Sequence, residues 1–144
     1  MKLQDKTSLP EADARISQVE SGGPTRVLLA EDDRALRRFL EVVLERAGYE
    51  VISASDGLEA MKLALSSRID VVITDAMMPN LSGHEFCRFI RNSQSLTHLP
   101  VILLSGLERG KNQNAEQADA FLSKPVSGES LIECIEKLLA GKSD

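Results

Sequence analysis

Acidic, hydroxyl and ammonium side chains stand directly after short apolar runs of this sequence. Carboxylates that lie close together repel one another unless a cation neutralises them. Mg²⁺ favours carboxylate and phosphate oxygens as ligands, and a carboxylate can itself attack a phosphoryl group. A lysine and a serine beside such a cation would hold the phosphoryl oxygens. The residues that indicate this chemistry are Glu31, Asp32, Asp33, Asp75, Ser105, Gly106 and Lys124.

Each of these residues also has a simpler interpretation when it is taken singly. The acids 31–33 would be favourable at a helix N-terminus, where carboxylates meet the positive end of the helix dipole. Asp75 could be a cap or turn residue, Ser105 a loop hydroxyl and Lys124 a solvated surface lysine. Their joint placement after successive apolar runs favours a common site. Asp75 is the natural nucleophile in it, because it stands alone behind the central run.

Apolar runs of strand length alternate with amphipathic stretches of helical length from residue 25 onward. Parallel strands need such crossover connections, so five alternations predict a doubly wound α/β fold. We expect a five-stranded parallel sheet in the flavodoxin-like order 2-1-3-4-5, with helices on both faces and ligands at the carboxyl ends of the strands. The least apolar run, 51–54, is expected at a sheet edge. The expected strands are 27–30, 51–54, 71–74, 101–104 and 120–122.

Two stretches depart from this alternation. Residues 1–24 are polar and end in Ser-Gly-Gly-Pro, which predicts a flexible N-terminal extension or linker. The folded domain is expected over residues 25–141, followed by a tail over 142–144. The segment 107–117 contains Gly110 and few apolar residues, so its helix support is poor. We therefore expect a shortened or mobile fourth helix there.

The composition of the 144 residues narrows the class of protein. A net charge of −5 argues against direct nucleic-acid binding, which normally needs a basic face. No apolar run approaches the ~20 residues that span a bilayer, so we expect a cytoplasmic protein without membrane insertion. Cys87 and Cys134 fall at helical positions where a small apolar residue fits, which favours free buried thiols over a disulfide.

Four segments together resemble the signature of bacterial response-regulator receiver domains. They are VLLAEDD at 27–33, DAMMPNLSG at 75–83, Ser105-Gly106 and Lys124-Pro125. The resemblance covers about residues 25–140 and implies a signalling switch, not an enzyme with a separate substrate. Such a domain would take a phosphoryl group from a phosphohistidine of a sensor histidine kinase or phosphotransfer protein. It would then change conformation and signal to a downstream protein partner.

The resemblance implies a role for each acid of the expected site. Asp75 would be the phosphoacceptor. Glu31 and Asp32 would hold Mg²⁺ together with Asp75 and the backbone carbonyl of Met77, with Asp32 as a direct ligand. Asp33 would be the helix cap and not a ligand.

The resemblance also implies how the phosphoryl group is held and detected. Ser105, Gly106 and Lys124 would bind it, and the Lys124–Pro125 peptide bond would be cis. Ser105 and Phe121 would form the conformational switch, because an inward movement of the hydroxyl vacates space that the aromatic ring can fill.

Other functions compete with this interpretation. A haloacid-dehalogenase-type phosphatase also uses an aspartyl phosphate and magnesium, but it needs a second Asp two residues after the nucleophile. Met77 occupies that position, which disfavours the phosphatase. A scaffold that has lost phosphorylation is disfavoured because every site position is filled. The chain could also be a receiver module cut from a hybrid kinase or a larger regulator.

Overall fold

The computed structural model describes residues 23–106 and 117–142. Five strands and four helices occur in this part of the chain. The strands are β2 (Arg26–Ala30), β3 (Glu50–Ala54), β4 (Val71–Asp75), β5 (Val101–Ser105) and β6 (Ala120–Ser123). The helices are α2 (Arg34–Arg46), α3 (Gly57–Ser66), α4 (Gly83–Asn92) and α5 (Gly128–Lys142).

The five strands form one parallel sheet in the order β3-β2-β4-β5-β6. Counted along the chain this is the order 2-1-3-4-5, so the predicted doubly wound fold is confirmed. The strand β3 lies at an edge, as its weaker apolar run predicts. The strands β2, β4 and β5 are buried on both faces apart from Arg26, which explains their continuous apolar sequences.

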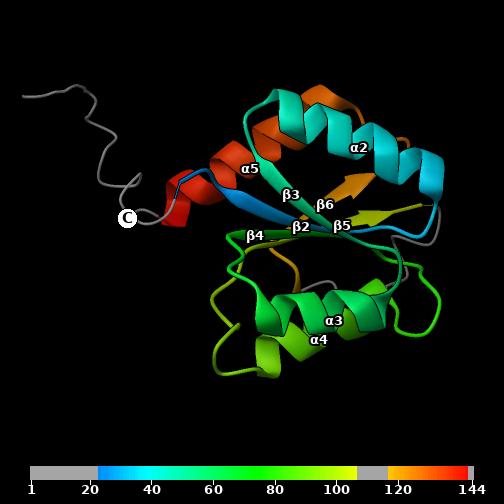
Figure 1. Cartoon of the computed structure of the whole chain (residues 1–144), viewed down its shortest axis with the longest axis vertical. Helices are drawn as coiled ribbons and strands as arrows, with labels where there is room; N and C mark the ends of the chain where they lie inside the picture. Colours follow the sequence, from blue (N-terminus) through cyan, green and yellow to red (C-terminus); the bar gives the residue numbers. More distant parts are fainter. Residues whose placement is uncertain (1–22, 107–116, 143–144) are drawn as a thin grey trace, which may run out of the picture.

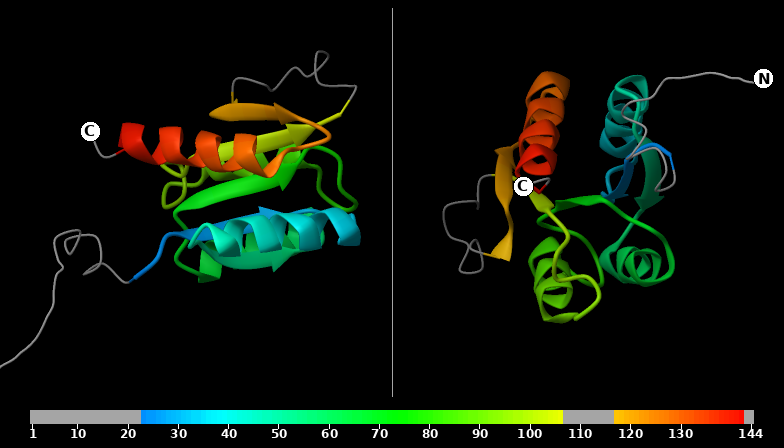
Figure 2. Two further views of the ribbon diagram at one scale, coloured as in Figure 1. Left: turned by 90° about the horizontal axis from the view of Figure 1, so that it is seen from above. Right: turned by 90° about the vertical axis from the view of Figure 1, so that its left-hand side faces the viewer.

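Helices cover both faces of the sheet (Figures 1 and 2). α2 and α5 lie on one face, and α3 and α4 lie on the other. Each face has its own apolar core, because successive residues of a strand point to opposite sides. Leu28 and Val72 pack toward α3 and α4, whereas Leu29 and Ile73 pack toward α2 and α5. Burial of these two cores holds the strand ends in fixed positions.

The helix starts follow from local hydrogen bonds. Asp33 is the N-cap of α2, and its Oδ1 accepts from the Leu36 N–H at 3.1 Å. Ser82 and Glu85 form a complete capping box at the start of α4. At α3 the cap of Asp56 forms, but the Glu59 carboxylate reaches back to Ser55 instead of the Asp56 N–H.

Several expectations fall on parts of the chain outside the described residues. The shortened fourth helix expected between β5 and β6, which is not the helix labelled α4, falls on residues 107–117, of which only residue 117 is described. The expected extension 1–24 and the tail 142–144 also fall almost wholly outside the described residues. Both cysteines are free thiols as predicted, although only Cys87 is fully buried and Cys134 is half-buried.

Candidate functional site

The carboxyl ends of the parallel strands bring the predicted site residues to one edge of the sheet. Asp75 is the last residue of β4, and Ser105 is the last residue of β5. Glu31 follows β2 directly, and Lys124 follows β6. Because β2 and β5 flank β4, the acids after β2 and the hydroxyl of β5 lie on either side of Asp75.

Three carboxylates gather at this edge. One oxygen from each of Glu31, Asp32 and Asp75 lies within 4.8 Å of the others. Glu31 and Asp75 are buried, whereas Asp32 is exposed. Burial raises the pKa of Glu31 to about 7, against the hydrogen bond from the Asp33 N–H and with the help of the Asp75 charge. The cluster therefore needs a positive charge to keep all three acids ionised.

Lys124 supplies one positive charge to the cluster. Its Nζ lies 2.7 Å from Asp75 Oδ2 and 3.7 Å from Glu31 Oε1. Burial alone would lower the pKa of Lys124, but the hydrogen bond to Asp75 and the neighbouring acids raise it above its ordinary value. The ammonium group is therefore charged at neutral pH, and it faces Asp75 directly.

Two buried polar atoms of this edge lack a hydrogen-bond partner among the described residues. They are the Oγ of Ser105 and the Oε1 of Glu31. A buried polar group without a partner is costly, so a bound ligand, ion or water commonly satisfies such an atom. A hydroxyl suits a phosphoryl oxygen, and clustered carboxylates suit a hard divalent cation. The donor set therefore fits Mg²⁺ and a phosphoryl group.

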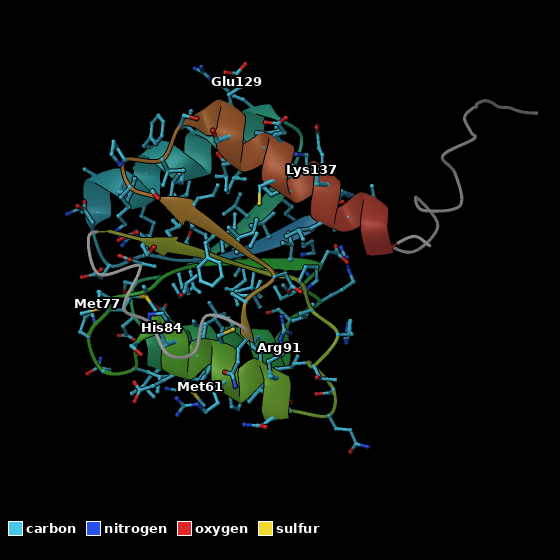
Figure 3. The ribbon with its side chains drawn as sticks, turned by 180° about the vertical axis from the view of Figure 1, so that it is seen from behind. Met61, Met77, His84, Arg91, Glu129 and Lys137 are labelled. Carbon is cyan, nitrogen blue, oxygen red and sulfur yellow. The ribbon has the colours of Figure 1, made fainter. Side chains whose placement is uncertain are left out.

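The loop that follows β4 is packed tightly against the site. A Cβ at Gly83 would overlap the backbone oxygen of Asp75, so this position requires glycine. The Met77 N–H donates to Asp75 Oδ1 at 3.3 Å, while the Met77 side chain is 61% exposed. Figure 3 shows this side chain at the surface, at the other end of the domain from Arg91.

The remaining predicted residues lie around the same edge. Gly106 follows β5 and is half-buried. Phe121 is half-buried in β6, where it pairs in register with Leu103 of β5. The Lys124–Pro125 peptide bond is cis.

Sequence reasoning did not single out Arg37. Its Nη1 donates to the backbone oxygen of Glu31 at 2.8 Å. An arginine on an amphipathic helix carries no signal in the sequence that separates it from its neighbours, so only the fold reveals this contact.

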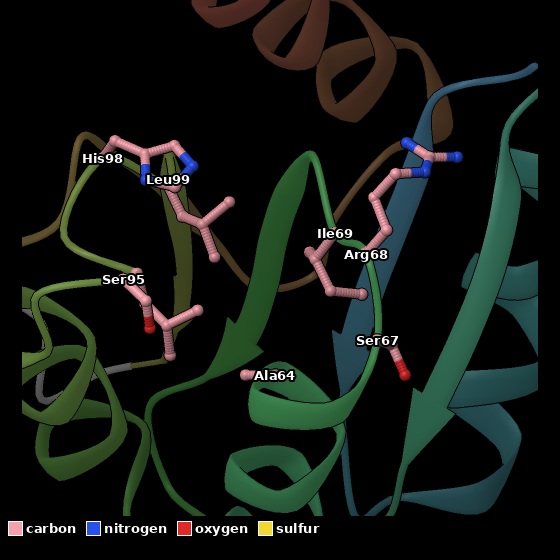
Figure 4. Close-up of a pocket in the computed structure, with 8 residues that line it drawn as sticks. Ala64, Ser67, Arg68, Ile69, Ser95, His98 and Leu99 are labelled. Carbon is pink, nitrogen blue, oxygen red and sulfur yellow. The ribbon is translucent and has the colours of Figure 1, made fainter. Parts of the chain in front are cut away.

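A hollow of about 200 Å³ lies at the opposite end of the sheet (Figure 4). It opens beside the residues that precede β4 and β5, between the end of α3 and the loop after α4. Its walls are mainly aliphatic and serine side chains, and none of the acid cluster reaches it. The chemistry of the described residues therefore gathers at the carboxyl ends of the strands. None of the described helices is both long and apolar enough to cross a membrane.

A sequence profile described as response regulator receiver domain matches residues 27–136. The match covers most of the chain, so the chain belongs to the response regulator receiver domain family. Domains of this family are phosphorelay switches that accept a phosphoryl group, bind Mg²⁺ at an acidic cluster and interact with histidine kinases and effectors.

Individual relatives agree with this assignment. The polar-differentiation response regulator DivK of Brucella anthropi is 32% identical over 119 residues, which cover 81% of this chain and 97% of DivK. Response regulator MprA of Mycobacterium sp. (strain KMS) is 38% identical over 119 residues, and the aligned part covers 81% of this chain and 51% of MprA. The chain thus spans about half the length of MprA.

A solved structure shares the fold. The response regulator TrrA from Thermotoga maritima, crystallised in complex with Mg²⁺ and BeF, has a TM-score of 0.73 and 31% identity. The similarity covers 79% of this chain and 98% of the TrrA chain.

Proposed function

We propose that this chain accepts a phosphoryl group on Asp75 from a sensor histidine kinase or a phosphotransfer protein and passes the signal to a protein partner in the cytoplasm. The observation that carries the proposal is the pairing of Asp75 with Lys124 at 2.7 Å inside a cluster of three carboxylates. A lysine beside the acceptor, and acids that can hold Mg²⁺, are groups that stabilise the charge in phosphoryl transfer.

In the proposed transfer, a carboxylate oxygen of Asp75 attacks the phosphorus atom of the phosphohistidine. The P–O bond forms as the P–N bond breaks, and the electron pair returns to the imidazole nitrogen. Lys124 offsets the negative charge that develops on the phosphoryl oxygens. Because the Met77 N–H and the Lys124 ammonium each bind one Asp75 oxygen, the carboxylate is oriented before the donor arrives.

The proposed metal ligands are Asp32, as a direct ligand, with Glu31, Asp75 and the backbone carbonyl of Met77. Bound Mg²⁺ would supply further positive charge against the phosphoryl oxygens. Glu31 and Asp75 are buried next to each other, and bound Mg²⁺ would favour the ionised form of Glu31, whose pKa is raised by burial.

The proposed switch begins at Ser105, whose buried hydroxyl has no partner among the described residues. A phosphoryl group on Asp75 offers acceptor oxygens to Ser105 and to the Gly106 N–H. Movement of Ser105 would let Phe121, on the neighbouring strand, change its rotamer. A complete switch from 1:99 to 99:1 requires about 5.5 kcal/mol of preference for one state.

The haloacid-dehalogenase-type phosphatase remains disfavoured as an alternative. It needs an acidic side chain two residues after the nucleophile, and Met77 presents an apolar side chain to solvent there. Since the chain spans only half of MprA, the output of this receiver could also lie on a separate segment of a larger regulator or hybrid kinase.

Incubation with Mg²⁺ and acetyl phosphate, followed by intact-mass measurement, tests the proposal. We expect the wild type to gain one phosphate and Asp75→Asn to gain none. A gain by both proteins would place the acceptor elsewhere, and a gain by neither would contradict the phosphoacceptor function. Turnover of a phosphate monoester by the wild type would support the phosphatase instead.

A further inference from the structure

We infer that Arg37 is a positioning residue for the magnesium site, because it fixes the peptide unit that joins the two acids after β2. The inference rests on the proposed function, since it concerns the metal ligands of that site. Arg37 lies in the first half of α2 and is half-buried. Its guanidinium donates from Nη1 to the Glu31 backbone oxygen at 2.8 Å. A charge-assisted bond of this length is stronger than a neutral one.

The Glu31 carbonyl belongs to the same planar peptide unit as the Asp32 N–H. Rotation of this unit would therefore change the direction in which the Asp32 side chain leaves the backbone. The other hydrogen bonds of this turn involve different groups. The Glu31 N–H donates to Ala54 O at 3.0 Å, and the Glu31 Oε2 accepts from the Asp33 N–H at 3.0 Å. Of these bonds, only the one from Arg37 engages the peptide unit between Glu31 and Asp32.

The exposure of Asp32 makes this restraint important. Its neighbour in the cluster, Glu31, is fully buried, and packing limits the side-chain positions of Glu31. Asp32 is exposed, so its carboxylate is directed mainly by its backbone. A metal ligand on an unrestrained backbone must lose conformational entropy when the cation binds. By holding the peptide unit beforehand, Arg37 lowers that cost and strengthens cation binding.

Arg37 and Lys124 contact different groups of the site. Lys124 is the cation that approaches the cluster from the β6 side, and Arg37 approaches the acid turn from α2. A guanidinium bonded to a backbone carbonyl does not occupy a carboxylate oxygen. Arg37 can therefore stabilise the turn without competing with Mg²⁺ for the ligands.

Arg38 offers a matched control on the same helix. Its side chain is 68% exposed, and it pairs with Glu41 at 3.1 Å. Replacement of either arginine by Met keeps the aliphatic stem and good helix propensity. The two replacements thus remove the same charge from the same helix, but only one removes a bond to the acid turn.

The test is titration of the purified proteins with MgCl₂ by isothermal calorimetry, with thermal unfolding measured in parallel. We expect Arg37→Met to weaken Mg²⁺ binding about tenfold, the low end of the loss when an outer partner of a metal ligand is removed. Arg38→Met should leave the dissociation constant unchanged. Arg37→Lys should fall between the wild type and Arg37→Met, because lysine keeps the charge and one donor.

A role for Arg37 in stability alone would lower Tm and leave the Mg²⁺ dissociation constant unchanged, and this result would overturn the inference. If Arg37→Met does not fold, the comparison passes to Arg37→Lys and Arg38→Lys, and equal affinities in that pair would overturn it too. Failure of the wild type to gain phosphate on Asp75 would contradict the proposed function. If the wild type is phosphorylated but Arg37→Met keeps the wild-type Mg²⁺ affinity, only the role of Arg37 is contradicted.

Discussion

The charged side chains at the two ends of the sheet differ in how completely other protein groups bind them. At the amino ends of the strands, Arg91 of α4 donates to the backbone oxygens of Thr97, Leu99 and Gln117. It also pairs with Asp119 at 2.6 Å. At the carboxyl ends, three acids share one lysine, and two buried polar atoms lack a hydrogen-bond partner among the described residues.

This difference indicates that the charges at the amino ends stabilise the fold, whereas those at the carboxyl ends serve ligand binding. A fully bonded charge such as Arg91 ties together the end of α4, the loop after it and the residue before β6, so it contributes to the fold. The acid cluster destabilises the metal-free fold near neutral pH, because the ionised Glu31 is buried and also lies beside the Asp75 charge. Evolution of a binding site commonly retains such locally unfavourable groups, and the rest of the fold compensates for them.

The largest expected effect concerns Lys124. We expect Lys124→Met to slow phosphorylation by acetyl phosphate about 100- to 1000-fold, the usual loss when one group that stabilises developing charge is removed. Lys137→Met, on the exposed surface of α5, is the control and should keep the wild-type rate. Intact-mass time courses measure both rates. A loss below tenfold in Lys124→Met would mean that the lysine does not face the phosphoryl group.

The next effect concerns the pH dependence of stability in metal-free protein. The pKa of Glu31 rises from 4.5 to about 7 on folding, so the native state binds a proton more tightly than the unfolded state. The contribution of Glu31 to the free energy of unfolding is therefore most favourable below pH 4.5 and falls as the pH rises to about 7. This pKa shift corresponds to a loss of about 3 kcal/mol in the free energy of unfolding.

Urea unfolding of the wild type and of Glu31→Gln across this pH range measures the effect. The difference between the two proteins should grow with pH in favour of Glu31→Gln, and Mg²⁺ should reduce it above pH 7. Parallel pH profiles of the two proteins would show that the acid cluster does not destabilise the fold.

A smaller effect is expected at the other end of the sheet. Arg91→Met removes a partly buried cation, 21% exposed, with its bonds to three carbonyls and a carboxylate. We expect a loss of about 2 kcal/mol in the free energy of unfolding. The exposed Arg88 on the same helix supplies the control, Arg88→Met. Mg²⁺ affinity should be unchanged in both, and a large loss of affinity in Arg91→Met would contradict the separation of the two ends.

The smallest effect concerns Met77, whose exposed apolar side chain gives water no polar group to bind near Asp75. We expect Met77→Asn to shorten the lifetime of the phosphoryl group by a few fold, about 1 kcal/mol in the barrier to hydrolysis. Dephosphorylation followed by intact mass after removal of the phosphodonor measures this lifetime. An unchanged lifetime would show that position 77 does not control access of water.

The strand order and the set of residues at the carboxyl ends of the strands could be predicted, because they follow from the alternation of apolar runs and amphipathic stretches. Apolar runs predict strands, and a parallel sheet places every carboxyl end at one edge, so Asp75, Ser105 and Lys124 had to meet there. The N-cap role of Asp33 followed from its position before the amphipathic stretch that forms α2.

Other features depend on contacts between residues far apart in the sequence. The overlap that excludes a side chain at Gly83 arises only when the loop after β4 turns back on Asp75. The bond from Arg37 to Glu31 requires the actual rotation of α2 about its axis. The partners of Arg91 include Gln117 and Asp119, which the sheet brings back beside α4. None of these can be read from periodicity.

The central claim is that one end of the sheet binds Mg²⁺ and a phosphoryl group together on Asp75. It is tested most directly by nitrogen-15 amide spectra recorded with Mg²⁺, with beryllofluoride and with both. We predict that Mg²⁺ alone shifts the amides after β2 and β4, that the amides after β5 shift strongly only when both are present, and that Asp75→Asn abolishes this second change. Shifts confined to the hollow between α3 and the loop after α4, or shifts after β5 that persist in Asp75→Asn, would contradict the claim.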